Sequence, residues 1–158
     1  MQKITTFLWF DDDAEEAMTL YVSIFRNSKI LNVSRYPASG PGEQGKVITA
    51  TFQLEGQQFM ALNGGPQFKF TEAISLFVSC ETQAEVDELW GKLTANGGAE
   101  SQCGWLKDKF GLSWQIIPTA LMRLLGDKDP VRAQRAMQAM LKMQKIEIAG
   151  LEAAARGE

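Results

Sequence analysis

An internal repeat is the feature that most constrains how this chain can fold. Residues 4–10 are β-branched and aromatic, which predicts a buried strand, and a helix of about three turns follows them. The same order restarts in the second half, where Glu85 lies 69 positions after Glu16. At that spacing Asp13 matches Thr82, so that each predicted helix opens with a capping box. The repeat therefore predicts two βαβββ-like modules, the second with one strand fewer.

The remaining segments place the module boundaries. The first half continues through the predicted strands "SKILNVSRY", "KVITATFQL" and "QQFMALN", and the second through "AESQCGWL" and "LSWQIIP". The Gly/Pro-rich loop "PASGPGEQG" is long for a hairpin, and we expect it to be mobile. The predicted fold class is α+β. Two modules, approximately 1–66 and 72–118, share one fold over residues 1–118, and a C-terminal helical extension occupies residues 119–158.

The extension begins with a recognisable helix start. Asp129 precedes Pro130, and proline is favoured at the first position of a helix. One face of this helix carries Ala133, Ala136, Met137, Met140 and Leu141. Two interpretations remain open: the helix covers the sheet of its own chain, which we favour, or its methionine-rich face clasps a second copy of the chain.

Composition excludes several classes of function. The chain contains no histidine, so a His-ligated metal site and a Ser-His or Cys-His nucleophile are both impossible. A net charge of −3 does not favour binding to nucleic acid or to an anionic membrane. Hydrophobic residues make up 45% of the chain and no apolar run approaches a membrane span, so we expect a soluble cytoplasmic protein with free thiols.

The two cysteines and the tryptophans each allow two interpretations. Cys80 and Cys103 are expected to be small buried or half-buried residues, although Lys107 or Lys109 could activate Cys103 as a reactive thiol. The aromatic residues are expected to be core, and the alternative is a ligand-binding wall. These aromatic residues are Trp9, Phe52, Trp105 and Trp114.

Three segments carry a resemblance to a known family. They are "LWFDDDAEEAMTLYVSIFRNSKI", "FMALNGGPQFKFTEAISLFVSC" and "CGWLKDKFGLSWQIIP". The chain closely resembles the PhnB-like group, often called 3-demethylubiquinone-9 3-methyltransferase, of the vicinal oxygen chelate superfamily. The resemblance runs over nearly the whole chain, the tail segment "AMLKMQKIEIA" included. It implies the glyoxalase/bleomycin resistance fold, in which paired βαβββ modules form a curled mixed sheet around a cleft, and it implies dimers, sometimes with swapped elements.

The resemblance also implies where a functional site would lie. Enzymes of the superfamily hold a divalent metal with His, Glu or Gln side chains from facing strands, and the last ligand is a Glu in a pattern like D-x-x-G-x-x-x-E. The matching run here is "DKFGLSWQ", which ends at Gln115. The other matching positions are Thr6, Met60 and Ser75, and Leu8 shares the predicted strand face of Thr6. These neutral groups would leave a divalent ion without charge compensation, so we predict no metal and no other cofactor.

The methyltransferase name finds no support in the motifs. A common S-adenosylmethionine site needs a Gly-rich turn that leads from a strand into a helix. Here the only tight glycine pair after a strand lies in "LNGGP", and "QFKF" follows it. We interpret this segment as a chain reversal between the modules.

Three hypotheses for function follow. The first is a metal-free homodimer that binds a small, largely apolar ligand in its cleft, like the bleomycin resistance proteins. The second is an enzyme of the glyoxalase superfamily that works without a His-ligated metal, with its catalytic residues unknown. The third is an interaction protein whose cleft is filled by its own side chains. We favour the first, with the ligand candidates Thr6, Leu8, Met60, Ser75 and Gln115.

Overall fold

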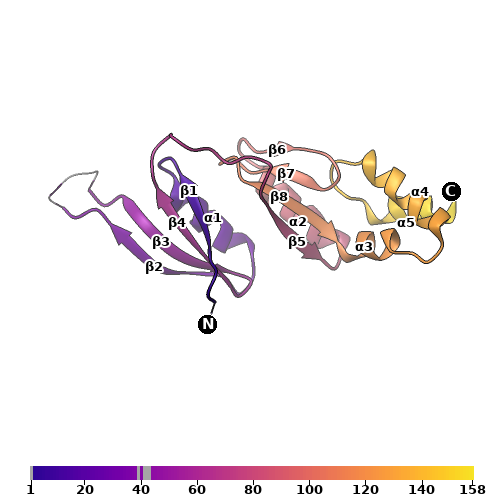
Figure 1. Cartoon of the computed structure of the whole chain (residues 1–158), viewed down its shortest axis with the longest axis horizontal. Helices are drawn as coiled ribbons and strands as arrows, with labels where there is room; N and C mark the ends of the chain where they lie inside the picture. Colours follow the sequence, from indigo (N-terminus) through magenta and orange to yellow (C-terminus); the bar gives the residue numbers. More distant parts are fainter. Residues whose placement is uncertain (1, 39, 41–43) are drawn as a thin grey trace. The chain divides into compact units, whose positions relative to one another are not determined.

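The computed structural model describes residues 2–38, 40 and 44–158, and the chain divides into two compact units, Met1–Phe70 and Thr71–Glu158 (Figure 1). The predicted mobility of the Gly/Pro-rich loop falls in part on residues 39 and 41–43, which lie outside this description. Within the described ranges, no helix combines the length and the apolar character that crossing a bilayer requires.

The first unit is a βαβββ module. Its sheet has the order β1-β4-β3-β2, in which β1 runs parallel to β4 and the other neighbours are antiparallel. Helix α1 packs on one face of this sheet, where Tyr21 lies 6.4 Å from Phe52 between ring centroids. The bounds are β1 Thr6–Phe10, α1 Ala14–Ile24, β2 Lys29–Arg35, β3 Val47–Leu54 and β4 Gln57–Asn63.

The second unit repeats this topology with the order β5-β8-β7-β6, and three helices follow. In α2 the apolar residues recur at helical spacing and form a stripe that is buried: Val86, Leu89, Trp90 and Leu93. The bounds are β5 Ser75–Cys80, α2 Gln83–Thr94, β6 Ala99–Glu100, β7 Trp105–Lys107, β8 Ser113–Pro118, α3 Thr119–Leu125, α4 Pro130–Leu141 and α5 Ile148–Arg156.

The paired βαβββ modules expected from the repeat are therefore confirmed, but the second module does not lack a strand. The segment "AESQCGWL" forms two strands, β6 and β7, instead of one. Cys103 and Gly104 between them have φ angles of 59° and 84°, which a continuous strand cannot contain. This turn is what restores the fourth strand.

The two predicted capping boxes have different outcomes. In α2 the Thr82 side chain accepts a hydrogen bond from the Glu85 amide at 3.2 Å, as predicted. In α1 the prediction is wrong, because the side chain of Asp13 makes no capping hydrogen bond. Instead Asn63, at the end of β4, accepts from the Ala14 amide at 2.9 Å and donates to the Val47 carbonyl at 3.1 Å. A long-range amide thus replaces the local carboxylate as the cap.

The C-terminal helices pack against the second unit. Asp129 caps α4 by accepting from the Val131 amide at 2.9 Å, as the Asp-Pro start predicts. The apolar cluster that holds the tail consists of Ile117, Leu121, Leu124, Ala136, Ile146, Leu151 and Ala155. Because Ile117 belongs to β8, the tail covers part of its own sheet, which was the favoured of the two interpretations. Met137 and Leu141 point outward, at 48% and 55% exposure.

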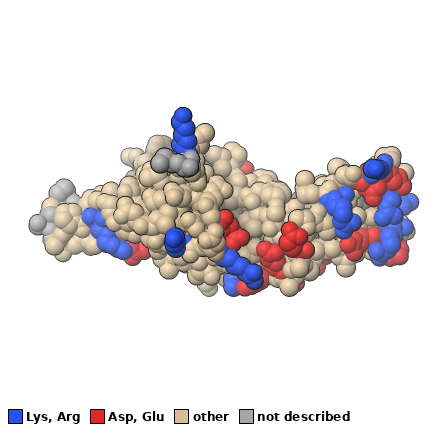
Figure 2. Space-filling model, turned by 90° about the horizontal axis from the view of Figure 1, so that it is seen from below, with Lys and Arg blue, Asp and Glu red and all other residues tan. Residues whose placement is uncertain are grey.

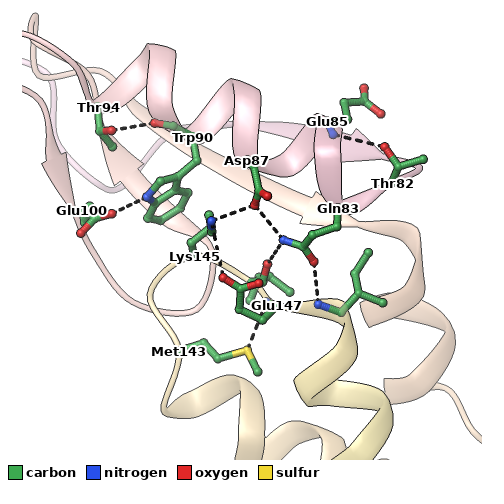
Figure 3. Close-up of polar contacts among 12 residues, drawn as sticks. Thr82, Gln83, Glu85, Asp87, Trp90, Thr94, Glu100, Met143, Lys145 and Glu147 are labelled. Carbon is green, nitrogen blue, oxygen red and sulfur yellow. Dashed lines mark hydrogen bonds and ion pairs between the residues drawn. The ribbon is translucent and has the colours of Figure 1, made fainter.

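Hydrogen bonds from α2 fix the segment before α5 (Figure 3). The Gln83 side-chain amide donates to the Ile146 carbonyl at 2.9 Å and accepts from the Ile148 amide at 2.8 Å. Lys145 pairs with Asp87 at 2.8 Å, and this contact raises the pKa of Lys145 and lowers that of Asp87. One side chain of α2 therefore satisfies two backbone groups of the tail.

Candidate functional site on the open face of the second sheet

Each four-stranded sheet has one face covered by its helix and one open face. In β8, Trp114 and Ile116 are 2% and 0% exposed on the α2 side. Side chains alternate along a strand, so Gln115 lies on the opposite, open face. Its partners across the sheet are Phe77 of β5 and Trp105 of β7. A row of two aromatic rings with an amide between them therefore crosses the open face.

The turn before β8 sets the direction of Gln115. Asp108 is 2% exposed and accepts hydrogen bonds from the amides of Phe110 and Leu112 at 2.9 and 3.0 Å. Its second oxygen accepts from the indole nitrogen of Trp114 at 2.9 Å. Because the carboxylate holds Trp114 on the α2 side, the next residue must point to the open face. The aspartate of the "DKFG" pattern therefore has a structural role.

The structure brings two of the predicted site residues together. The Gln115 side chain donates a hydrogen bond to the Ser75 hydroxyl at 2.9 Å. Both side chains are partly buried, and Phe77 beside them is 50% exposed. An amide, a hydroxyl and an aromatic ring can orient a ligand by hydrogen bonding and cover an apolar part of it.

The predicted residues of the first unit lie on two different faces. Leu8 is 5% exposed in the core beneath α1, and Thr6 shares its side of β1. Met60 pairs with Phe7, so it points to the open face instead. The open-face residue of β1 beside Met60 is thus Phe7, which is 46% exposed. Thr6 and Leu8 consequently do not join Met60 in a common site.

A one-residue difference in spacing explains why the sequence pointed to Thr6. The pair Phe7–Met60 in the first sheet corresponds to the pair Phe77–Gln115 in the second. The first strands of the two units are therefore related by a sequence offset of 77 − 7 = 70 residues, one more than the offset of 69 that relates the helices. The turn glycines Gly56 and Gly111 match each other, and counting from them leads to Met60 and Gln115. The residues paired with these two positions on the first strands are Phe7 and Phe77. A one-residue slip moves a side chain to the opposite face of a sheet.

A cavity of about 260 Å³ opens on the second sheet beside this row. Its lining includes Glu72, Glu100, Ser101, Trp105, Lys107 and Ser113. Lys107 and Glu72 form an exposed ion pair, and the hydrogen bond from Lys107 lowers the pKa of Glu72. Ser113 is 1% exposed, and its hydroxyl has no hydrogen-bond partner among the described residues. A buried hydroxyl without a partner costs about 1–3 kcal/mol, which a ligand or water could recover.

A larger hollow of about 640 Å³ lies in the first unit at the start of α1. Its walls are charged, and two exposed ion pairs cross it, Lys46 with Asp12 at 3.2 Å and Arg35 with Glu15. Burial and the neighbouring Glu16 and Asp11 raise the pKa of Asp13. Its ionic groups are largely exposed and paired with one another, so we regard the smaller cavity, with its buried hydroxyl, as the better ligand site.

The open face does not fit a metal ion. Among the described residues, no group of three His, Cys, Asp or Glu side chains could hold one. Beside Gln115 the open face offers a hydroxyl and two aromatic rings, which do not balance a 2+ charge. On the face seen in Figure 2, basic and acidic side chains lie side by side at the end that holds α4 and α5.

Comparison with solved structures identifies the fold. The chain is similar to a protein of Pseudomonas aeruginosa at 18% identity, over 75% of this chain and 98% of that chain, with a TM-score of 0.63. It is similar to a fosfomycin resistance protein of Listeria monocytogenes, solved with Mn(II) and sulfate, at 13% identity over 75% and 90%, with a TM-score of 0.50. A possible glyoxalase of Bacillus cereus is 11% identical, over 74% of this chain and 98% of that chain, with a TM-score of 0.51. The two mixed sheets therefore have the glyoxalase/bleomycin resistance fold.

The family follows from closer matches. The model of the family described as 3-demethylubiquinone-9 3-methyltransferase matches residues 2–117. A solved PhnB protein of Bacillus cereus is 46% identical, over 74% of this chain and 99% of that chain, with a TM-score of 0.69. The chain belongs to this PhnB-like family. No curated protein matches it. The family match ends at residue 117, so the resemblance expected over the tail stays a prediction.

Proposed function

We propose that this chain is a metal-free homodimeric protein that binds a small, largely apolar ligand on the open face of its second sheet. The observation that carries the proposal is the hydrogen bond between Gln115 and Ser75, flanked by the exposed ring of Phe77. Polar groups that face each other beside an open cavity favour ligand binding over a cleft filled by its own side chains.

A second copy of the chain is the partner that the resemblance implies. Phe7 and Phe77, on the open faces of the two sheets, are 46% and 50% exposed. Exposed aromatic side chains are typical of association surfaces, which supports the homodimer.

Methyl transfer, the reaction in the family's name, is not proposed for this chain. β4 ends at Asn63, and no helix lies between it and β5. Both sheets are mixed, whereas the common S-adenosylmethionine fold needs a parallel sheet with a helix after the Gly-rich turn. The alternative function, an enzyme acting without a His-ligated metal, would need a reactive group on the open face. The side chains next to Gln115 there are the Ser75 hydroxyl and the rings of Phe77 and Trp105.

Native mass spectrometry of the purified chain tests this function. We expect a dimer that carries an organic molecule and no stoichiometric metal, with the Gln115→Ala variant losing the organic molecule while remaining dimeric. Gln144→Ala is the matched control, because Gln144 is an exposed amide on the tail. Stoichiometric zinc, nickel or iron after dialysis against a weak chelator, or a monomer, would contradict the proposal.

A further inference from the structure

The cavity on the second sheet is lined by a polar group that the protein itself does not use. Ser113 pairs with Lys107 of β7 and with Ser75 of β5, so its side chain lies on the same open face as Gln115. It is 1% exposed and lines the cavity, and its hydroxyl lacks a partner among residues 2–38, 40 and 44–158. Such a hydroxyl can donate to a ligand oxygen or accept from a ligand hydroxyl.

The charges on the open-face walls of the cavity cancel. Lys107 lies on β7 and Glu72 just before β5, and these strands flank β8, so the ion pair between them crosses β8 beside Ser113. The Glu100 side chain points to the other face, where its carboxylate accepts a hydrogen bond from the Trp90 indole nitrogen at 2.5 Å (Figure 3). Among the described residues of the lining, the open face therefore carries one positive and one negative charge, which pair with each other.

Walls of this kind favour an uncharged ligand. A cation or an anion in the cavity meets one charge of its own sign, and it gains the other charge only by competing with the existing ion pair. A charged group would also lose water without a free counter-charge to replace it. A neutral oxygen needs no counter-charge, because the Ser113 hydroxyl supplies a hydrogen bond.

The remaining wall of the cavity favours a ring and limits its size. Trp105 is half-buried in the lining, and an indole packs well against another aromatic ring. The cavity volume of about 260 Å³ lies below the range of about 300–1,000 Å³ that is usual for drug-sized ligands. A single ring with a short substituent is therefore the size of molecule that this cavity favours.

We propose that this cavity binds a small uncharged aromatic molecule with one hydrogen-bonding oxygen, its ring against Trp105 and its oxygen on Ser113. Because exposed ion pairs contribute little to stability, the pair of Glu72 and Lys107 can move aside as the ligand reaches the buried hydroxyl. This inference rests on the proposed function, because it names the ligand class for the same open face.

Four probes that share a benzyl group test the ligand class: benzyl alcohol, ethylbenzene, benzylamine and phenylacetate. They carry a hydroxyl, a methyl, an ammonium and a carboxylate group at the same position. Binding to the full chain is followed by shifts of the Trp105 indole and Ser113 amide signals in two-dimensional NMR, and the indole signal is assigned by its loss in Trp105→Phe. We expect benzyl alcohol to bind about threefold or more tightly than the cation and the anion.

The Ser113→Ala variant tests the hydrogen bond. It removes a hydroxyl without a protein partner, so its melting temperature should not fall. We expect it to weaken the binding of benzyl alcohol about threefold or more and to leave ethylbenzene, which has no oxygen, unchanged. Ser34→Ala, at an exposed serine of β2 in the first unit, is the matched control and should change neither affinity.

Two further variants test why the ligand is uncharged. Glu72→Gln leaves the Lys107 ammonium without its ion-pair partner, so phenylacetate should gain up to about fivefold relative to benzyl alcohol. Lys107→Gln should favour benzylamine in the same way. Glu88→Gln, at an exposed pair with Lys92 on α2, is the charge control and should favour neither probe.

Each contrary result has a distinct meaning. If benzylamine or phenylacetate binds the unmodified chain as tightly as benzyl alcohol, or if neither gains in the variants of the ion pair, the uncharged class is overturned. Unchanged affinity for benzyl alcohol in Ser113→Ala overturns the role of the hydroxyl. If the native chain carries an organic molecule that shifts Gln115 and Phe77 while no probe shifts Trp105, the proposed function stands and this inference fails. If neither is observed, both fail.

Discussion

Gln115 occupies the place where the resemblance to superfamily enzymes implies a metal-binding carboxylate. Its neighbours decide what a carboxylate could do there. Ser75 bonds to it and Phe77 pairs with it, and neither compensates a divalent charge. A single acidic side chain in a partly buried place does not repay the dehydration of a metal ion.

Gln115→Glu should therefore not create a metal site. After incubation with Mn²⁺, Ni²⁺ or Zn²⁺ and dialysis, elemental analysis should give well below one ion per chain, as for the unmodified protein. One ion per chain would show that other ligands join this face.

Cys80 is fully buried at the end of β5, and burial together with Glu85 and Glu81 raises the pKa of its thiol to about 12. At pH 8 only about one Cys80 in 10⁴ would be a thiolate, the form that reacts. Iodoacetamide should therefore label the partly exposed Cys103 and spare Cys80 in the native chain, as peptide mass spectrometry would show. Denatured protein, labelled at both positions, is the control. Labelling of native Cys80 at the rate of Cys103 would contradict this environment.

The same pKa has a consequence for stability. The folded state holds the Cys80 proton more tightly than the unfolded state, whose thiol has a pKa of about 9. The contribution of this proton to the free energy of unfolding is fully present below pH 9 and is lost as pH rises toward 12. The Cys80→Ser variant should lose less stability than the unmodified chain as pH rises from 9 to 12. Urea unfolding at several pH values in this range measures the difference.

At the scale of elements, the connection between α2 and the tail depends on one amide. Gln83→Ala would leave the Ile146 carbonyl and the Ile148 amide without their side-chain partner. We expect a loss of about 1–2 kcal/mol and faster hydrogen exchange from residue 143 to the end of α5. Gln144→Ala, an exposed amide in the same segment, should change neither quantity. Unchanged protection in Gln83→Ala would mean that the apolar cluster alone holds the tail.

The two predicted capping boxes show how far a local sequence signal can predict the cap of a helix. The Thr82 box forms as the sequence predicts because both of its partners lie within one helical turn. The Asp13 box does not form, and Asn63, 49 residues away from Ala14, caps the helix terminus instead. Local spacing predicts the start of each helix, but it cannot show that a distant side chain will cap the same helix terminus.

At the scale of the whole molecule, the chain consists of a family domain and an addition. The family match ends at residue 117, and helices α3 to α5 follow. The tail buries Ile117 and accepts backbone hydrogen bonds from Cys103 and Gly104, each at 2.8 Å, through Met143 and Gln144. The second sheet and the tail are thus parts of one folded unit.

Truncation after Pro118 should therefore destabilise the second unit. It exposes Ile117 and leaves two amides without partners, which we expect to cost about 3 kcal/mol or more. Urea unfolding followed by NMR measures this, and signals of the first unit, such as the Phe52 amide, serve as the internal control. A truncated chain with unchanged second-unit stability would show that the tail is dispensable for folding.

The sequence alone determined the βαβββ repeat, the apolar stripe of α2 and the start of α4. These depend on periodicity, caps and turns, which are properties of neighbouring residues. The tertiary structure alone decided that Phe7, not Thr6, lies beside Met60, that Asn63 caps α1, that a turn at Cys103 and Gly104 divides a strand, and that Ser113 lines a cavity. Strand register sets the first and last of these: a shift of one residue reverses every side chain, and register is fixed only when distant strands pair.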